Sequence, residues 1–140
     1  MKPPKRDAKT FEKVPAYDTW INGKIIDIEY DEAHRSTYQG EEKVRPAVRF
    51  KLGLEGCNFP KRTRWMTFSY NEKAGLFKQF VSVLVEGAKP DMDLDLDVLK
   101  GMAIKTMWSQ NEEFDNLAMI RPLGEKVKAD AAVEVTEVPF

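Results

Sequence analysis

The feature that most constrains this chain is a regular alternation of residue types over positions 44–54, VRPAVRFKLGL. One set of alternate positions is apolar throughout and consists of Val44, Pro46, Val48, Phe50, Leu52 and Leu54. The other set is Arg45, Ala47, Arg49, Lys51 and Gly53. Because successive side chains of a strand point to opposite faces, the pattern predicts a strand with one face in a core and a positively charged face outside.

Four other segments have the β-branched and aromatic composition of strands. They are residues 19–30, 61–70, 101–110 and 116–123. Residues 71–89 instead carry apolar side chains at helical spacing, with Asn71 suited to an N-cap and Gly87 to a C-terminal stop. The chain is therefore predicted to be all-β with one helix, which lies between strands three and four. This element order matches a five-stranded OB-like β-barrel, a fold that binds oligonucleotides on strands two and three.

Length and composition set the expected organisation. The 140 residues suit one domain, and 22 Lys and Arg nearly balance 23 Asp and Glu, so only the distribution of charge can indicate a partner. Residues 1–14 predict a flexible basic arm, 15–123 the domain and 124–140 a flexible acidic tail. A single cysteine, with no signal peptide or long apolar run, predicts a cytoplasmic protein without a disulfide or membrane segment.

Cations and aromatic rings gather on the predicted second and third strands. If these strands pair, one surface holds several cations and the indole of Trp65. Cations neutralise phosphates, and a ring offers a nucleobase a stacking platform of roughly 1–3 kcal/mol. The predicted phosphate contacts are Arg45, Arg49, Lys51, Arg62, Arg64 and, from the fourth strand, Lys105. The alternative is a solvated face, with the tryptophan in the core or covered by arginine stems.

Other aromatic residues leave choices open. Trp65 is the predicted stacking residue, but the opposite phase of strand 61–70 would bury it and expose Phe68 and Tyr70. A loop over residues 31–43 is predicted to border the groove and to supply Arg35 and Tyr38. Trp108 is a lesser stacking candidate, although it suits a core position better, as does Trp20.

Signatures of catalysis and of metal binding are missing from the sequence. The chain has no Gly-rich phosphate loop and no nucleophile elbow, and the lone His34 has no partner at metal spacing. The acidic stretch at 91–97, DMDLDLD, lacks the glycine and glutamate of an EF-hand loop and predicts a turn whose leucines pack on the barrel. We therefore expect that the chain is not an enzyme and that it binds no metal and no cofactor.

The chain closes on EVTEVPF, with Glu134, Glu137, Pro139 and Phe140. An OB-like barrel followed by an acidic tail ending in Pro-Phe resembles the bacterial and phage single-stranded DNA-binding proteins. The segment DVLKG at 97–101, before the fourth strand, is similar to phage-type members. The acids of the tail are fewer than in the bacterial members and are interrupted by valines.

The resemblance implies two roles. The barrel would hold single-stranded DNA without reading its sequence, and the tail would recruit replication or recombination proteins through the Phe140 ring and carboxylate. RNA in place of DNA, and a homo-oligomer, remain open. The alternative function is a phage structural or adaptor protein, in which barrel and tail serve assembly with other proteins.

Overall fold

Strands β1 (Trp20–Tyr38) and β2 (Glu41–Leu54) form a long antiparallel hairpin in the computed structural model, which describes residues 13–111 and 114–128. Tyr38 pairs with Glu41, so Gln39 and Gly40 make a two-residue turn. Both turn residues have positive φ, 52° and 80°, as the twist of a tight hairpin requires.

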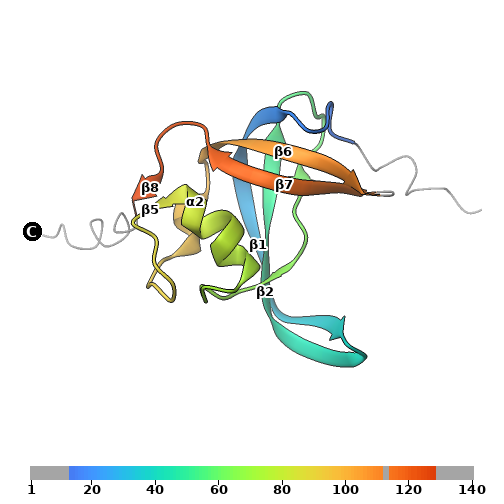
Figure 1. Cartoon of the computed structure of the whole chain (residues 1–140), viewed down its shortest axis with the longest axis vertical. Helices are drawn as coiled ribbons and strands as arrows, with labels where there is room; N and C mark the ends of the chain where they lie inside the picture. Colours follow the sequence, from blue (N-terminus) through green and yellow to red (C-terminus); the bar gives the residue numbers. More distant parts are fainter. Residues whose placement is uncertain (1–12, 112–113, 129–140) are drawn as a thin grey trace, which may run out of the picture.

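The predicted loop over residues 31–43 is wrong, because these residues continue both strands. The hairpin end projects beyond the body of the molecule (Figure 1). Buried apolar residues stop at Ile28 on β1 and begin at Ala47 on β2. A strand that covers no core needs no apolar face, so residues 31–43 show no alternation, and Val44 and Pro46, which were predicted to face the core, are exposed. Ala47, which was predicted on the charged face, is buried.

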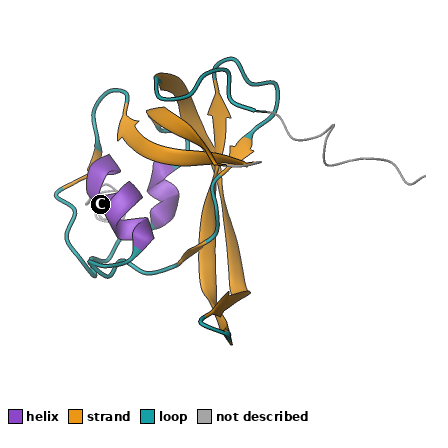
Figure 2. Ribbon diagram, turned by 45° about the vertical axis from the view of Figure 1, so that its right-hand side comes forward, coloured by secondary structure: helices purple, strands orange, loops and turns teal. Residues whose placement is uncertain are grey.

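The remaining strands extend the hairpin into one sheet with the order β3-β2-β1-β6-β7, and β4 also pairs with β2. The sheet does not close on itself, and the described residues form no ladder between β7 and β3 or β4. Figure 2 shows the hairpin crossing the β6–β7 pair, with the helix on one side. The strand bounds are β3 (Lys61–Arg62), β4 (Met66–Thr67), β6 (Ala103–Asn111) and β7 (Phe114–Pro122).

The predicted strand 61–70 is thus two short strands. Thr63 causes the interruption, because its hydroxyl accepts a hydrogen bond from the Phe50 amide at 3.0 Å, where a backbone carbonyl would do so in a ladder. Its own amide donates to the Phe50 carbonyl at 2.9 Å. The alternation of buried and exposed side chains also breaks along the segment, since Met66 is buried while Phe68, two residues on, is exposed.

The helical segment has π-type turns over η1 (Leu76–Val81) and α-type turns over α2 (Ser82–Leu84). The residues predicted for its buried face are buried: Leu76, Phe77, Phe80, Val81 and Leu84. It starts later than predicted, because the Asn71 side chain accepts from the Lys73 amide and closes a separate turn. The 3₁₀ turn η2 (Leu96–Leu99) buries Leu96 and Leu99, as predicted for the acidic stretch.

Both predicted boundaries shift outward. Val14, assigned to the arm, is buried in the core. β8 (Val127–Lys128), assigned to the tail, pairs in parallel with β5 (Val85–Glu86). No helix in the described ranges is long and apolar enough to cross a membrane.

A buried ion pair bridges the unclosed side of the sheet. Lys61 on β3 places its Nζ 2.7 Å from Oδ2 of Asp115 on β7, and the two side chains are 10% and 2% exposed. The Asp115 carboxylate also accepts from the Tyr17 hydroxyl at 2.6 Å and from the Val14 amide at 2.8 Å. Side chains therefore join the two edges that backbone hydrogen bonds do not join.

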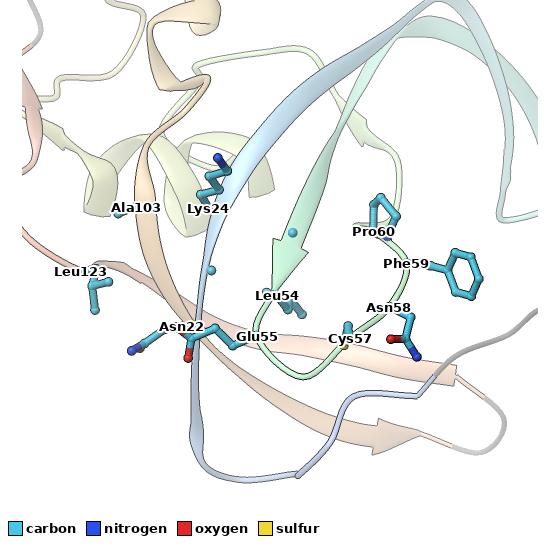
Figure 3. Close-up of a pocket in the computed structure, with 12 residues that line it drawn as sticks. Asn22, Lys24, Leu54, Glu55, Cys57, Asn58, Phe59, Pro60, Ala103 and Leu123 are labelled. Carbon is cyan, nitrogen blue, oxygen red and sulfur yellow. The ribbon is translucent and has the colours of Figure 1, made fainter.

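A pocket of about 500 Å³ lies beside the start of β1, between the 55–60 loop and the end of β7 (Figure 3). Gly23 and Gly53 line it, and a Cβ on Gly23 would collide with the Gly53 carbonyl oxygen. The absence of a side chain at Gly23 therefore permits a close backbone approach between β1 and β2.

Candidate nucleic-acid interface

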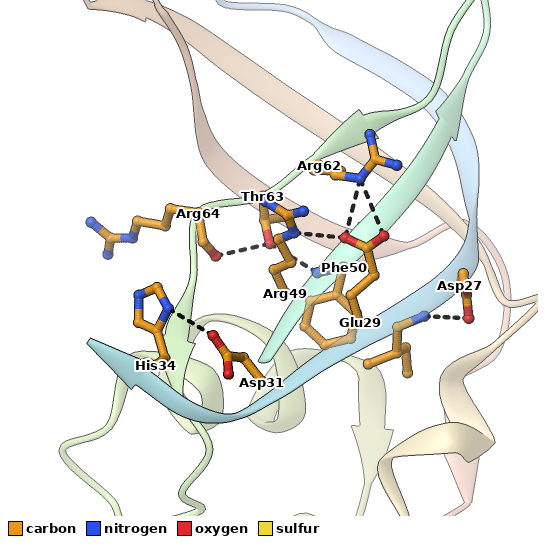
Figure 4. Close-up of polar contacts among 10 residues, drawn as sticks. Asp27, Glu29, Asp31, His34, Arg49, Phe50, Arg62, Thr63 and Arg64 are labelled. Atoms are coloured by element: carbon orange, nitrogen blue, oxygen red, sulfur yellow. Dashed lines mark hydrogen bonds and ion pairs between the residues drawn. The ribbon is translucent and has the colours of Figure 1, made fainter. Parts of the chain in front are cut away.

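The outward face of the hairpin carries a three-residue charge cluster. Glu29 pairs across the strands with Arg49, and Lys51 pairs with Arg62 on β3. The Nε of Arg49 lies 2.6 Å from Oε1 of Glu29, and the Nε of Arg62 lies 3.1 Å from the same oxygen. Figure 4 shows both guanidinium groups converging on the carboxylate. Two cations and one anion give the cluster a net charge of +1.

Glu29 keeps its charge in this setting. Partial burial by itself raises the carboxyl pKa, but hydrogen bonds from Arg49 and then Arg62 outweigh that effect, and the pKa is lowered. The carboxylate therefore remains ionised at neutral pH. The carboxylate marks a position at which two guanidinium groups bind one anion.

The ring of Trp65 lies against this cluster. The Arg49 Cζ is 4.4 Å from the ring centroid, a cation–π contact. The His34 ring is 5.2 Å away, and its Nδ1 lies 3.3 Å from the Asp31 carboxylate. Trp65 is half-buried, so part of its surface remains accessible. The phase that would have sealed Trp65 in the core is excluded.

The other predicted cations of the hairpin differ in their surroundings. Arg45 and Arg64 are exposed and Lys51 is half-buried, and none of the three forms an ion pair with another described residue. Arg64 points away from Arg49 and Arg62 (Figure 4). Arg35 is exposed on β1 and lies 3.6 Å from Glu42.

Acids also share the outward face. Asp27 lies opposite Lys51, and Asp31 lies opposite Ala47. A backbone hydrogen bond from Ile28 lowers the pKa of Asp27, with Lys100 and Lys51 adding to it. The face is therefore a mixed surface in which cations are in excess, and it is less positive than strand 44–54 alone indicates.

Two predicted contact residues lie elsewhere. Trp108 is 2% exposed, and its Nε1 donates to the Thr106 hydroxyl at 2.7 Å, so its assignment as a stacking residue is wrong. Lys105 lies on β6, opposite Asn22 rather than beside the Glu29 cluster. Its Nζ sits 4.8 Å from the ring centroid of Trp20.

Some of the predicted contact residues lie outside the side chains that the structure describes. Tyr38 is the last residue of β1, at the hairpin turn, and its side chain is outside the described set. The predicted partner-binding residues lie beyond residue 128, outside the described residues: Glu134, Glu137, Pro139 and Phe140.

Sequence reasoning missed Glu29 and the exposure of Trp20. The signal for Glu29 is in residues 27–31, DIEYD, where acids alternate on the strand next to the basic one. Pairing two alternating strands of opposite charge would have placed Glu29 against Arg49. Trp20 gives no such signal, because a tryptophan at the start of a strand looks the same whether buried or exposed.

Aromatic rings on the other face of the hairpin have acidic neighbours. Tyr30 and Phe68 have ring centroids 5.5 Å apart, and Phe68 also contacts Tyr70. The Tyr30 hydroxyl donates to Asp97 at 2.7 Å. Burial, with the charges of Asp95 and Asp97, raises the pKa of Tyr70 to about 12. These rings suit contact with phosphates poorly.

Comparisons with models of protein families, with curated proteins and with solved structures find no match to this chain. Within residues 13–111 and 114–128, no three His, Cys, Asp or Glu side chains are grouped to hold a metal ion.

Proposed function

We propose that this chain binds single-stranded nucleic acid, DNA foremost, without reading its sequence and without catalysis. The observation that carries the proposal is the convergence of Arg49 and Arg62 on one carboxylate beside the accessible ring of Trp65. Guanidinium groups that hold a carboxylate also match a phosphate, and the ring is a stacking surface for a base. This positive surface continues at Arg45 and Lys51 on β2 and at Arg64 between β3 and β4.

The ion pairs with Glu29 do not prevent such binding. The side chains of Arg49, Arg62 and Glu29 are 30%, 43% and 28% exposed, and ion pairs open to water are worth about 0–1 kcal/mol. A phosphate can therefore share the two guanidinium groups or replace the carboxylate. Glu29 weakens non-specific attraction but leaves the site competent.

The topology supports an OB-like barrel, which we include in the proposal. β1 pairs with both β2 and β6, and the helix lies between the third strand, here β3 with β4, and the fourth, here β6. The missing ladder between β3 and β7 is replaced by the Lys61–Asp115 pair. In such a barrel the Glu29 cluster would lie on the face with which OB folds bind oligonucleotides.

A fluorescence titration with oligo-dT across a salt series tests the proposal. We expect log affinity to fall linearly with log salt, by about 0.7 for each phosphate neutralised. Arg49→Ala should weaken binding equally for all sequences, and Trp65→Ala should also reduce tryptophan quenching. Unchanged fluorescence and mobility with oligo-dT at low salt would overturn the proposal.

The tail completes the proposed function. Glu134, Glu137, Pro139 and Phe140 would recruit replication or recombination proteins, because an aromatic ring near acidic side chains suits an apolar pocket with a basic rim. Deleting residues 138–140 should leave oligo-dT affinity unchanged or higher. A loss of affinity on deletion would contradict a separate role for the tail.

Exposed apolar residues support a second candidate, a structural or adaptor protein. Phe59 is 66% exposed and Val44 is 54% exposed, on different segments of the surface. Under this alternative, deleting residues 138–140 abolishes assembly with a partner, and oligo-dT does not bind at low salt.

A further inference from the structure

A second cation–aromatic pair lies at the other end of β1. Trp20 is 39% exposed, and the Lys105 Nζ lies 4.8 Å above its ring. Asn22, two residues along β1, pairs with Lys105, which pairs in turn with Arg121 on β7. Trp20, Lys105 and Arg121 therefore share the outward face of three neighbouring strands.

This face differs from the hairpin face in its charges. Ile21, Ile104, Thr106 and Ile120 point to the core, so the residues between them point outward. The outward residues of the described pairs include three cations and no acid: Trp20, Asn22, Lys24, Ala103, Lys105, Met107, Met119 and Arg121. A phosphate that binds on these three strands has no carboxylate to displace, and the acid of the adjoining pocket is Glu55 on the 55–60 loop.

The pocket of about 500 Å³ continues this face. Asn22, Lys24 and Ala103 belong to both, and Leu123 follows at the end of β7. Figure 3 shows these residues on one side of the pocket and the loop with Phe59 on the other. The volume lies in the range of sites for small organic groups, so a nucleobase fits.

We propose that this outward face of β1, β6 and β7 binds a second segment of the same single strand, an inference that rests on the proposed function. Trp20 stacks on a base, Lys105 and Arg121 hold phosphates, and the pocket beside Lys24 takes a neighbouring base. A protein partner is the poorer occupant, because lysine is depleted in protein interfaces and this face carries Lys24 and Lys105.

The two sites lie far enough apart to be separated by oligonucleotide length. Glu29 lies nine positions after Trp20 along β1, which is at most about 30 Å at roughly 3.3 Å per residue, since a register shift between Ile25 and Asp27 interrupts the regular strand. A stacked strand rises about 3.4 Å per nucleotide, so about nine nucleotides bridge that distance. A five-nucleotide dT then occupies one site, whereas a twenty-nucleotide dT reaches both.

The first experiment compares dT5 and dT20 binding to the wild-type chain and to Lys105→Glu/Arg121→Glu. The matched control is Lys73→Glu/Lys89→Glu, which makes the same charge change at exposed lysines near the helix. We expect the first variant to lose at least about tenfold in dT20 affinity beyond the control, and twofold or less for dT5. Its salt slope with dT20 should fall by about 1.4, two phosphates at about 0.7 each.

The outcomes separate this inference from the proposed function. Equal dT20 losses in variant and control would overturn the inference while dT binding itself survives. Absence of binding by the wild-type chain to either oligonucleotide would remove the proposed function and the inference together. A changed oligomeric state in light scattering, with dT20 affinity equal to the control, would assign the face to protein contact and overturn the inference.

Fluorescence supplies a second readout that does not depend on charge reversal. Trp20→Phe and Trp65→Phe should each lose part of the quenching caused by dT20, because each removes one reporting ring. Trp20→Ala should weaken dT20 binding by at least about fivefold, the loss of one stacked base. Full quenching in Trp20→Phe would overturn the assignment of Trp20.

Discussion

Lys61 and Arg62 are neighbours on β3, and each binds a carboxylate, but they belong to opposite sides of the sheet. Lys61 points inward to Asp115, where the two side chains are 10% and 2% exposed. Arg62 points outward to Glu29, where they are 43% and 28% exposed. The same chemistry is therefore enclosed in one place and open to water in the other. Burial decides the difference, because water screens the outer pair and not the inner one.

The largest expected effect is on the inner pair. Asp115→Ala leaves Lys61 buried without its carboxylate and should lower the free energy of unfolding by about 3–5 kcal/mol, measured by urea denaturation. The double variant Lys61→Met/Asp115→Leu should recover only part of that loss, because it removes the buried charge but also removes the acceptor of the Tyr17 hydroxyl and the Val14 amide. A loss below about 1 kcal/mol in Asp115→Ala would show that the pair is not needed to hold β3 and β7 together.

Acid should act on the same pair. Burial raises the Asp115 pKa, but Lys61, Tyr17 and the Val14 amide outweigh it, so the folded-state pKa lies below the usual value of 3.8. The stabilisation is complete above the unfolded-state pKa, near 3.9, and is lost as pH falls through the folded-state value. Asp115→Asn should show a shallower decline in stability below pH 4 than the wild-type chain. Equal slopes in the two proteins would contradict this assignment.

The outer cluster should respond in binding rather than in stability. Glu29→Gln raises the cluster charge from +1 to +2 and should strengthen oligo-dT binding a few-fold at low salt, with a salt slope steeper by about 0.7. Its free energy of unfolding should change by less than about 1 kcal/mol. Glu86→Gln, at an exposed glutamate on β5, is the matched control. Weaker binding in Glu29→Gln would instead mean that Glu29 holds the arginines in place.

The smallest effect on binding is expected at the aromatic residues beside the acids. Tyr30→Phe removes the hydroxyl that donates to Asp97 and should lower the free energy of unfolding by about 0.5–1.5 kcal/mol. Oligo-dT affinity should stay within twofold, because the Asp95 and Asp97 charges repel phosphates from this face. A larger loss of affinity would mean that the bound nucleic acid contacts both faces of the hairpin.

Prediction from the sequence succeeded where a residue's environment follows from its own neighbours in the chain. The alternation predicted over residues 44–54 gives a buried face from Val48 to Leu54 but not at Val44 and Pro46, and the helical spacing from Leu76 to Leu84 gives a face that is buried. It failed at residues 31–43, where no core lies beneath the strands, and at Thr63, where a side-chain hydroxyl replaces a ladder carbonyl. The Arg49 guanidinium was placed on the correct face, but its carboxylate partner was missed.

The sequence by itself determined a mostly β domain, its buried faces and the positive side of β2, because periodicity is a property of consecutive residues. Tertiary structure alone decided which cations meet acids and which meet aromatic rings. It brought Glu29 to Arg49 and Arg62, and Lys105 to Trp20, and it sealed Trp108 in the core. The physical reason is that ion pairing and stacking depend on side chains from different strands, whose register is fixed only when the sheet forms.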